Sequence, residues 1–322
     1  MAGGFAHITL VDTLCMNANV LDGIPNLTPA MKRALSYFLN FVELGSVSPD
    51  YPNLTLLSSN AAGWANVMHY HKTLDVVRKA IPLIYKLDYK LNDTLKCMAW
   101  IFGYTAHVIT DLVIHPVVTL KVGPYKHNKR KHRLCEIHQD VYIFHKVNNI
   151  EITRAEYFKD AGISSCCQEG DRKKLYQNVA NLWKQCLPPV PGTVFTFDDD
   201  LDRPTKSPNP DQWHKNYIKM IDGIAEEGGK LPPLIKQIAE GQGVVYPELE
   251  DLDKDYIEGL VTPEGKTSSY DEIFKWTQEK VKASWSELGK ALNTGDPGCF
   301  TIPNGNLDTG RSENMIFWRE KE

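Results

Sequence analysis

The chain has 322 residues, 42% of them hydrophobic, with a formal net charge of -4 and a sequence pI near 6.2. This length allows one large or two ordinary domains with a sizeable core. The modest acidity argues against a nonspecific nucleic-acid binder, but it does not exclude a nuclease.

Seven cysteines form no regular framework, which favours a reducing compartment, and buried thiols are expected at Cys15, Cys97 and Cys135. The N-terminal stretch MAGGFAHITLVDTLCM lacks a basic n-region and a long apolar h-region, so no signal peptide is predicted. No run of about 18 to 20 uniformly apolar residues predicts a membrane span. We therefore expect a cytoplasmic protein without integral membrane association, or a secreted one if a leader has been removed.

Histidine is unevenly distributed, with nine of the ten between His7 and His145 and only His214 beyond them. This places the chemistry in the N-terminal half. His7 lies at the start of an apolar segment, residues 5–18, that becomes helical. A further helix is expected to begin at Thr28-Pro29 and to end at Gly45.

The segment GSVSPDYP places Asp50 between Pro49 and Pro52, so its carboxylate is presented from a rigid loop. The next helix opens with WANVMHYHK. Its His69 and His71 would be about 200° apart on a helix, so they cannot both face one site. The spacing alone leaves open which of the two is a ligand.

The most informative segment is WIFGYTAHVITDLVIH, which places His107, Asp111 and His115 at i, i+4 and i+8 of an apolar helix. The helix is predicted to begin near Asn92-Asp93 and to end or kink at Pro116. A buried carboxylate is costly unless it is paired or bound to metal. Imidazoles one turn above and below it therefore suggest a metal ion.

Residues 123–131 form a short basic segment, which is either a solvated connection or a rim that attracts an anionic substrate. A second row of polar side chains on one helix face follows this segment. His132 and Glu136 repeat the i, i+4 spacing, and Asp140 extends it by one turn. His138 lies on another face and is interpreted as structural or exposed.

Beyond residue 150 the pattern predicts amphipathic helices over residues 172–187, 211–225, 231–240 and 270–292. The acidic runs 198–200 and 248–255 read as solvated loop faces, with a calcium site as the alternative. The fold class is therefore all-α. We expect residues 1–190 to form a metal-binding helical core and residues 191–322 a helical extension that acts as a lid or specificity region.

The candidate metal ligands are imidazoles and carboxylates without thiolates, which suits zinc and argues against a structural zinc finger. They are too numerous for one ion, so two or three ions are expected, with carboxylates as bridges. Iron is the alternative metal, because such ligands accept either. The set comprises His7, Asp50, His69, His107, Asp111, His115, His132 and Glu136.

The order of these motifs resembles the zinc-dependent phospholipase C family, to which the S1/P1 nucleases are related by the same helical tri-zinc design. The resemblance covers residues 5–145 and extends towards 190, and it implies a phospholipase C/P1 nuclease-like helical bundle. Its most specific parts are H-x-x-x-D-x-x-x-H at 107–115 and H-x-x-x-E at 132–136. No tryptophan precedes His7, whereas secreted members take a ligand from a mature N-terminal tryptophan.

The resemblance also implies roles for individual residues. His69, chosen over His71 on the family pattern, joins His107, Asp111 and Asp50 around one zinc. His115, His132 and Glu136 hold a second, and His7 with bridging Asp111 belongs to a third. Asp50 would also position or deprotonate the attacking water, so its role is catalytic.

The expected reaction is hydrolysis of a phosphodiester, in a phospholipid or a soluble compound, by zinc-activated water. Two alternatives share the metal core. One is a nuclease or nucleotidase, for which nucleic acid is the substrate and Trp64, Tyr70, Trp100, Tyr104 and Tyr125 are candidate stacking residues. The other is a biosynthetic enzyme that uses zinc or iron on a small molecule. The oligomeric state is left open.

Overall fold

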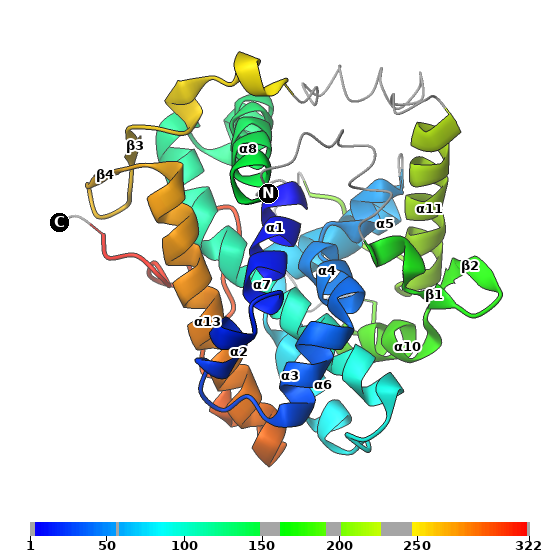
Figure 1. Ribbon diagram of the computed structural model, residues 1–322. Helices are drawn as coiled ribbons and strands as arrows, with labels where there is room; N and C mark the ends of the chain where they lie inside the picture. Colours follow the sequence, from blue (N-terminus) through cyan, green and yellow to red (C-terminus); the bar gives the residue numbers. More distant parts are fainter. Residues whose placement is uncertain (1–3, 56–57, 149–161, 191–200, 227–246, 321–322) are drawn as a thin grey trace.

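The structure is a computed structural model that describes residues 4–55, 58–148, 162–190, 201–226 and 247–320. The described part is built from helices, so the predicted all-α class is confirmed (Figure 1). The α-helices are α1 (Gly4–Cys15), α2 (Ala18–Asp22), α3 (Pro29–Tyr37), α4 (Leu39–Val47), α5 (Ser59–Asn66), α6 (Asp75–Tyr85), α7 (Asn92–Val122), α8 (Tyr125–Asn148), α10 (Gln177–Cys186), α11 (Pro210–Glu226) and α13 (Tyr270–Thr294).

Shorter elements connect these helices. Two antiparallel pairs are formed by β1 (Cys167–Gln168) with β2 (Asp171–Leu175) and by β3 (Leu260–Val261) with β4 (Thr267–Ser268). The short helical turns are η1 (Tyr51–Leu54), the π-helical η2 (Val67–His71), η3 (Gly162–Ser165), η4 (Leu249–Asp251), η5 (Lys254–Tyr256) and η6 (Pro297–Cys299).

Helix α7 is the centre of the fold. It spans 31 residues, and α4 and α13 pack along it while α1, α3, α6, α8 and α10 contact it from other sides (Figure 1). Contrary to the prediction from sequence, α7 is long and apolar enough to cross a membrane, but its apolar window is 100% buried inside the protein. Core packing therefore accounts for this composition, because an element surrounded on all sides is apolar all round.

Helices α4 and α7 pack closely enough for their backbones to touch. A Cβ atom on Gly45 would lie 2.1 Å from the Trp100 carbonyl oxygen, and one on Gly103 would lie 2.0 Å from that of Val42. Gly45 was expected to end its helix, and this was wrong, since α4 continues to Val47. Glycine is required there because the two backbones touch. The segment that follows α4 is thereby held beside α7.

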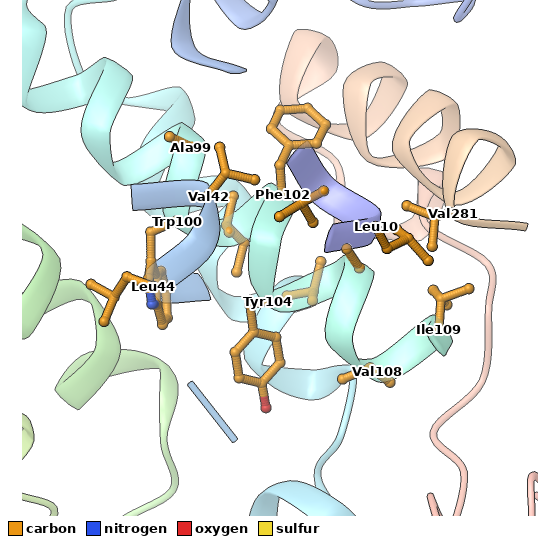
Figure 2. Packing of buried hydrophobic residues seen from close by; sticks show 14 of the residues in the cluster. Leu10, Val42, Leu44, Ala99, Trp100, Phe102, Tyr104, Val108, Ile109 and Val281 are labelled. Atoms are coloured by element: carbon orange, nitrogen blue, oxygen red, sulfur yellow. The ribbon is translucent and has the colours of Figure 1, made fainter. Parts of the chain in front are cut away.

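Apolar side chains from four helices fill the space around this contact (Figure 2). They belong to one continuous cluster of buried residues, in which α1, α4, α7 and α13 all take part. Figure 2 shows Leu10 of α1, Val42 and Leu44 of α4, Trp100, Phe102, Tyr104, Val108 and Ile109 of α7, and Val281 of α13. The polar face of α7 is therefore held inside a rigid apolar frame.

Pro116 was expected to end or kink the central helix, but α7 continues through it to Val122. Proline lacks the N–H that would bond the carbonyl four residues earlier, and its ring crowds that turn. The C-terminal segment packs on this turn, where the Trp318 indole donates to the Val113 carbonyl at 2.9 Å, one residue after the Leu112 carbonyl that Pro116 leaves without its helical donor. Gly310 packs directly on the Pro116 ring.

The C-terminal predictions have mixed outcomes. Helices α11 and α13 match the predicted helices at 211–225 and 270–292, whereas the start of the predicted 172–187 helix is strand β2, with α10 following it. The segments 231–240 and 198–200 lie outside the described residues, and 248–255 contains η4 and η5. The boundary near residue 190 stays a prediction. All seven cysteines are free thiols, and Cys15, Cys97 and Cys135 are buried.

Candidate metal centre

Helix α7 contributes three polar side chains to one buried face, as its spacing predicts. The Nε2 atom of His107 lies 3.3 Å from Oδ2 of Asp111, and Nε2 of His115 lies 3.3 Å from Oδ1 of the same carboxylate. The three side chains are at most 1% exposed. The carboxylate is therefore enclosed between imidazoles one turn before it and one turn after it.

His7 of α1 completes the surroundings of this carboxylate. Its Nε2 atom lies 3.3 Å from Oδ1 of Asp111, and its ring stacks on that of His107 with centroids 4.0 Å apart. The position of α1 is set by Asp140 of α8, whose carboxylate accepts a hydrogen bond from the Ala6 backbone N–H at 2.8 Å. Asp140, expected to extend the row of polar side chains on α8, instead caps the first turn of α1.

Asp50 and His69 approach from the other side. Asp50 directly precedes η1, and its Oδ1 atom lies 3.1 Å from Nε2 of His69. With His107 these two form a group whose ligand atoms all lie within 4.8 Å of one another, and His7, His107 and Asp111 form a second such group. His69 is buried in the π-helical turn η2, whereas His71 is half-buried and belongs to neither group.

The remaining two predicted ligands, His132 and Glu136 of α8, are more loosely arranged. Oε1 of Glu136 lies 3.9 Å from Nε2 of His115 and 4.0 Å from Nδ1 of His132. The side chains of Glu136 and His132 are buried. Arg133 Nη1 lies 3.6 Å from the other oxygen of Glu136. Glu136 is thus beside His115, on the side of the centre formed by α8.

Backbone carbonyls orient four of the imidazoles. The Nδ1 atoms of His69, His107 and His115 donate to the carbonyl oxygens of Ala65, Ser46 and Leu307 at 2.7, 2.8 and 2.8 Å. In His132 the two ring nitrogens exchange roles, and Nε2 donates to the Gly123 carbonyl oxygen at 2.6 Å. Because a carbonyl only accepts, each of these nitrogens carries the proton and the other nitrogen presents its lone pair to the centre.

Around Asp111 the electrostatics favour the protonation states that bind a cation, whereas at His69 burial lowers the pKa but the contact with Asp50 outweighs it and raises the pKa. Burial lowers the pKa of His7, the pKa of His132 and, most strongly, the pKa of His115. Burial would raise the pKa of Asp111, but the neighbouring His115, His107 and His7 outweigh it and hold that pKa well below its usual value. Neutral imidazoles around an ionised carboxylate are what a metal ion requires.

The hydrogen bonding of the imidazoles shows that these side chains fit a metal ion. The buried Nε2 atoms of His7, His69, His107 and His115 make no hydrogen bond within the described residues. A lone pair on Nε2 of His115 facing a carboxylate oxygen at 3.3 Å is repulsive unless a cation lies between them. Zinc bonds of about 2.1 Å place two ligands of one tetrahedral ion about 3.4 Å apart. Iron suits the same donors.

The exposed fractions differ among the predicted ligands. The Asp50 side chain is 22% exposed, whereas those of the other seven predicted ligands are at most 4% exposed. Among the five predicted stacking aromatics, Trp64, Trp100 and Tyr104 are fully buried and cannot contact a base. Tyr70 and Tyr125 are half-buried.

The sequence interpretation missed part of the centre. Leu307 accepts the hydrogen bond from His115, and Asp308 Oδ1 lies 3.9 Å from the same Nδ1 atom. Residues 304–310 read NGNLDTG, a typical turn sequence. The available signal was a carboxylate within a turn, and nothing in its spacing relates it to the histidines nearly 200 residues earlier.

These observations define an all-α protein with a buried imidazole and carboxylate centre built on its central helix. A family model described as zinc dependent phospholipase C matches residues 7–190, and the chain belongs to this family. The match contains all eight predicted ligands and ends before α11, α13 and the segment around Asp308. Searches of curated proteins and of solved structures each gave no significant match. Family membership indicates a zinc-dependent hydrolase.

Proposed function

We propose that this protein hydrolyses a phosphodiester in the manner of a phospholipase C, acting on a phospholipid or a soluble phosphodiester, with two or three zinc ions held by the eight predicted ligands. The observation that carries the proposal is Asp111, fully buried, with Nε2 atoms of His7, His107 and His115 each 3.3 Å from its oxygens. Bound zinc would neutralise charge on the phosphoryl oxygens and lower the pKa of a coordinated water.

Asp50 is the group that contacts the attacking water in this proposal. Burial would raise the pKa of Asp50, but the contact with His69 and the nearby His107 outweigh it and lower the pKa below its usual value. The carboxylate is therefore ionised at neutral pH, and it is also the most exposed of the eight predicted ligands. A lowered pKa makes this carboxylate a weak base towards bulk water, but it can accept a hydrogen bond from a water whose own pKa bound zinc would lower, align that water for attack and take up its proton.

The first turns of α8 provide a second supporting feature, on the substrate side. Lys126, Lys129, Arg130 and Lys131 are exposed and immediately precede His132. The Tyr125 ring packs edge-on against the His132 ring, with centroids 5.3 Å apart. A cluster of cations beside a site raises the local concentration of anionic substrates. This favours the interpretation of residues 123–131 as a rim for a phosphate-bearing substrate.

The test compares three substrates on zinc-loaded protein: phosphatidylcholine in mixed micelles, bis(p-nitrophenyl) phosphate and single-stranded DNA. We expect hydrolysis of the first two, and a fall in kcat of about 10² to 10⁴ in Asp50→Asn, as for the loss of a general base. Asp222→Asn on α11 is the matched control and should keep the wild-type rate.

Zinc content is measured in each preparation, so that loss of metal and loss of the catalytic carboxylate are separated. Zinc binding without cleavage of any of the three substrates would contradict the proposal. Cleavage of DNA alone would replace it with the nuclease alternative.

A further inference from the structure

Residues 304–310 lie outside the family match and form a segment that we call the C-terminal strap. The strap runs between η2, which carries His69, and α7, which carries His115. The Leu307 backbone N–H donates to the His69 carbonyl at 2.9 Å, and the Leu307 carbonyl accepts from Nδ1 of His115 at 2.8 Å. A single residue of the strap thus links two predicted ligands from different elements.

Asp308 adds a carboxylate behind His115. Its Oδ2 atom accepts a hydrogen bond from the Tyr70 hydroxyl at 2.9 Å, and its Oδ1 atom lies 3.9 Å from Nδ1 of His115. The Asp308 carbonyl accepts from the Thr119 hydroxyl at 3.3 Å. The His115 ring therefore has Asp111 at its Nε2 edge and Asp308 near its Nδ1 edge. A carboxylate on the outer side of an imidazole increases the basicity of the nitrogen that binds metal.

The first residue of the strap is fixed by hydrogen bonds to the start of α6. The Asn304 side-chain oxygen accepts the backbone N–H groups of Leu74 and Asp75 at 2.8 and 3.0 Å, and its amide donates to the Asp75 carboxylate at 2.8 Å. These bonds satisfy donors at a helix N-terminus. The first residue of the strap is therefore fixed relative to α6.

The last residue of the strap is fixed by packing on the central helix. Gly310 has φ of +69°, and a Cβ atom there would lie 2.4 Å from Cγ of Pro116 and 2.8 Å from the Leu112 carbonyl oxygen. No larger residue fits without moving the strap or α7. Because both ends are fixed, the position of Leu307 relative to His115 is fixed as well.

We propose that the C-terminal strap is a positioning element of the zinc centre, in which Leu307 and Asp308 hold His115 in the orientation and tautomer that bind metal. The proposal rests on the zinc centre proposed above. It makes the metal site depend on residues that follow the family match by more than a hundred positions. Leu307 and Asp308 act through His115 and do not contact the substrate.

The test measures the rate at which zinc is released from the full-length protein to a chromogenic chelator. We expect Asp308→Asn, which removes the charge but keeps an acceptor for Tyr70, to release zinc faster than wild type, and Asp308→Ala to release it faster still. Loss of a partner behind a metal-binding histidine typically weakens metal affinity about 10- to 100-fold.

Gly310→Ala displaces the strap without changing any side chain that faces the centre, and we expect about tenfold faster release. Gly170→Ala is the matched control, because Gly170 also has positive φ, at +78°, but a Cβ atom there meets nothing within 4 Å. It should release zinc at the wild-type rate. The absorption spectrum of the cobalt-substituted protein should change in the Asp308 and Gly310 variants and not in the control.

Circular dichroism establishes that each variant is folded, and the nearly isosteric Asp308→Asn keeps the test valid if Gly310→Ala does not fold. If wild type retains zinc and every folded strap variant releases it at the wild-type rate, the strap proposal is overturned and the proposed function stands. A wild-type protein that binds no zinc overturns both.

Discussion

Among the residues that the structure describes, the buried carboxyl groups of Asp111 and Glu43 have opposite surroundings. Asp111 faces three imidazoles and its pKa is held low, whereas Glu43 of α4 faces Asp12 of α1. Burial and the Asp12 charge raise the pKa of Glu43 to about 8, although a hydrogen bond from the Gly162 backbone acts in the opposite direction. Glu43 also neighbours the buried thiols of Cys15 and Cys166. The surroundings of Asp111 are suited to a cation, and those of Glu43 to a shared proton.

Glu43 makes stability depend on pH in a predictable direction. Its pKa is near 4.5 in the unfolded chain and about 8 in the folded protein, so the folded state binds more protons across this window. Its contribution to stability is therefore full below pH 4.5 and is lost as the pH rises towards 8, by on the order of 5 kcal/mol. Glu43→Gln, which stays neutral, should be more stable than wild type above pH 8.

The measurement is the difference in unfolding free energy between variant and wild type, by urea at several pH values and constant zinc, so that contributions from the metal cancel. Glu279→Gln on the exposed face of α13 is the control and should show a small difference that does not vary between pH 5 and 8.5. A difference for Glu43→Gln that stays constant over the same range would contradict the assignment.

At the residue scale, the predictable ligands were those with local spacing. His107, Asp111 and His115 share one helix face, and His132 with Glu136 share another, so periodicity brings each set together. His7, Asp50 and His69 come from other elements, and the order of motifs in the resemblance supplied them. Their proximity to α7 depends on packing, which spacing does not reveal. Asp308 had neither signal, because its position follows from the path of the strap.

At the level of elements, the contact of α4 with α7 decides whether the centre assembles. The Ser46 carbonyl that orients His107 belongs to α4, and Asp50 lies three residues after the end of this helix. Both are positioned only because Gly45 and Gly103 let the two backbones approach. The sequence interpretation of Gly45 as a helix end failed because glycine serves both termini and close contacts, and a single chain does not distinguish them.

Gly103→Ala should therefore destabilise the protein by about 3 kcal/mol, the upper end for an overpacked core, because its Cβ atom would meet the Val42 carbonyl at 2.0 Å. Unfolding of the chelator-treated protein by urea measures this without a contribution from zinc. Gly23→Ala is the matched control, since its Cβ atom would have neighbours at 3.4 Å and the backbone φ is -76°. Equal stabilities of the two variants would show that the helices can separate freely.

Pro116 is a second position where the helix end could not be predicted from the local sequence. Proline in an isolated helical pattern predicts an end, whereas here the helix continues through a turn on which Gly310 and Trp318 pack. These contacts come from a segment about 200 residues away. The class of fold and the presence of helices were predictable from composition and period, whereas helix limits depend on partners that only the folded chain provides.

For the whole molecule, the predicted ligands come from α1, the segment after α4, η2, α7 and α8, so binding of zinc should stabilise the folded state strongly. A ligand at a thousand times its Kd contributes about 4 kcal/mol, which corresponds to about 6 °C in Tm for a chain of this size. We expect a chelator to lower Tm by about this amount in calorimetry, and added zinc to restore it. An unchanged Tm would mean that zinc does not bind the folded protein appreciably.

The most direct test of the account is the metal content of the purified protein, measured by mass spectrometry for wild type and for Asp111→Asn in protein never exposed to chelator. We predict two or three zinc ions per chain in wild type and a loss of zinc in the variant, because Asp111 is the carboxylate shared by His7, His107 and His115. Iron in place of zinc would keep the ligands and favour the biosynthetic alternative. Absence of metal from wild type, or equal zinc in both proteins, would contradict the metal centre.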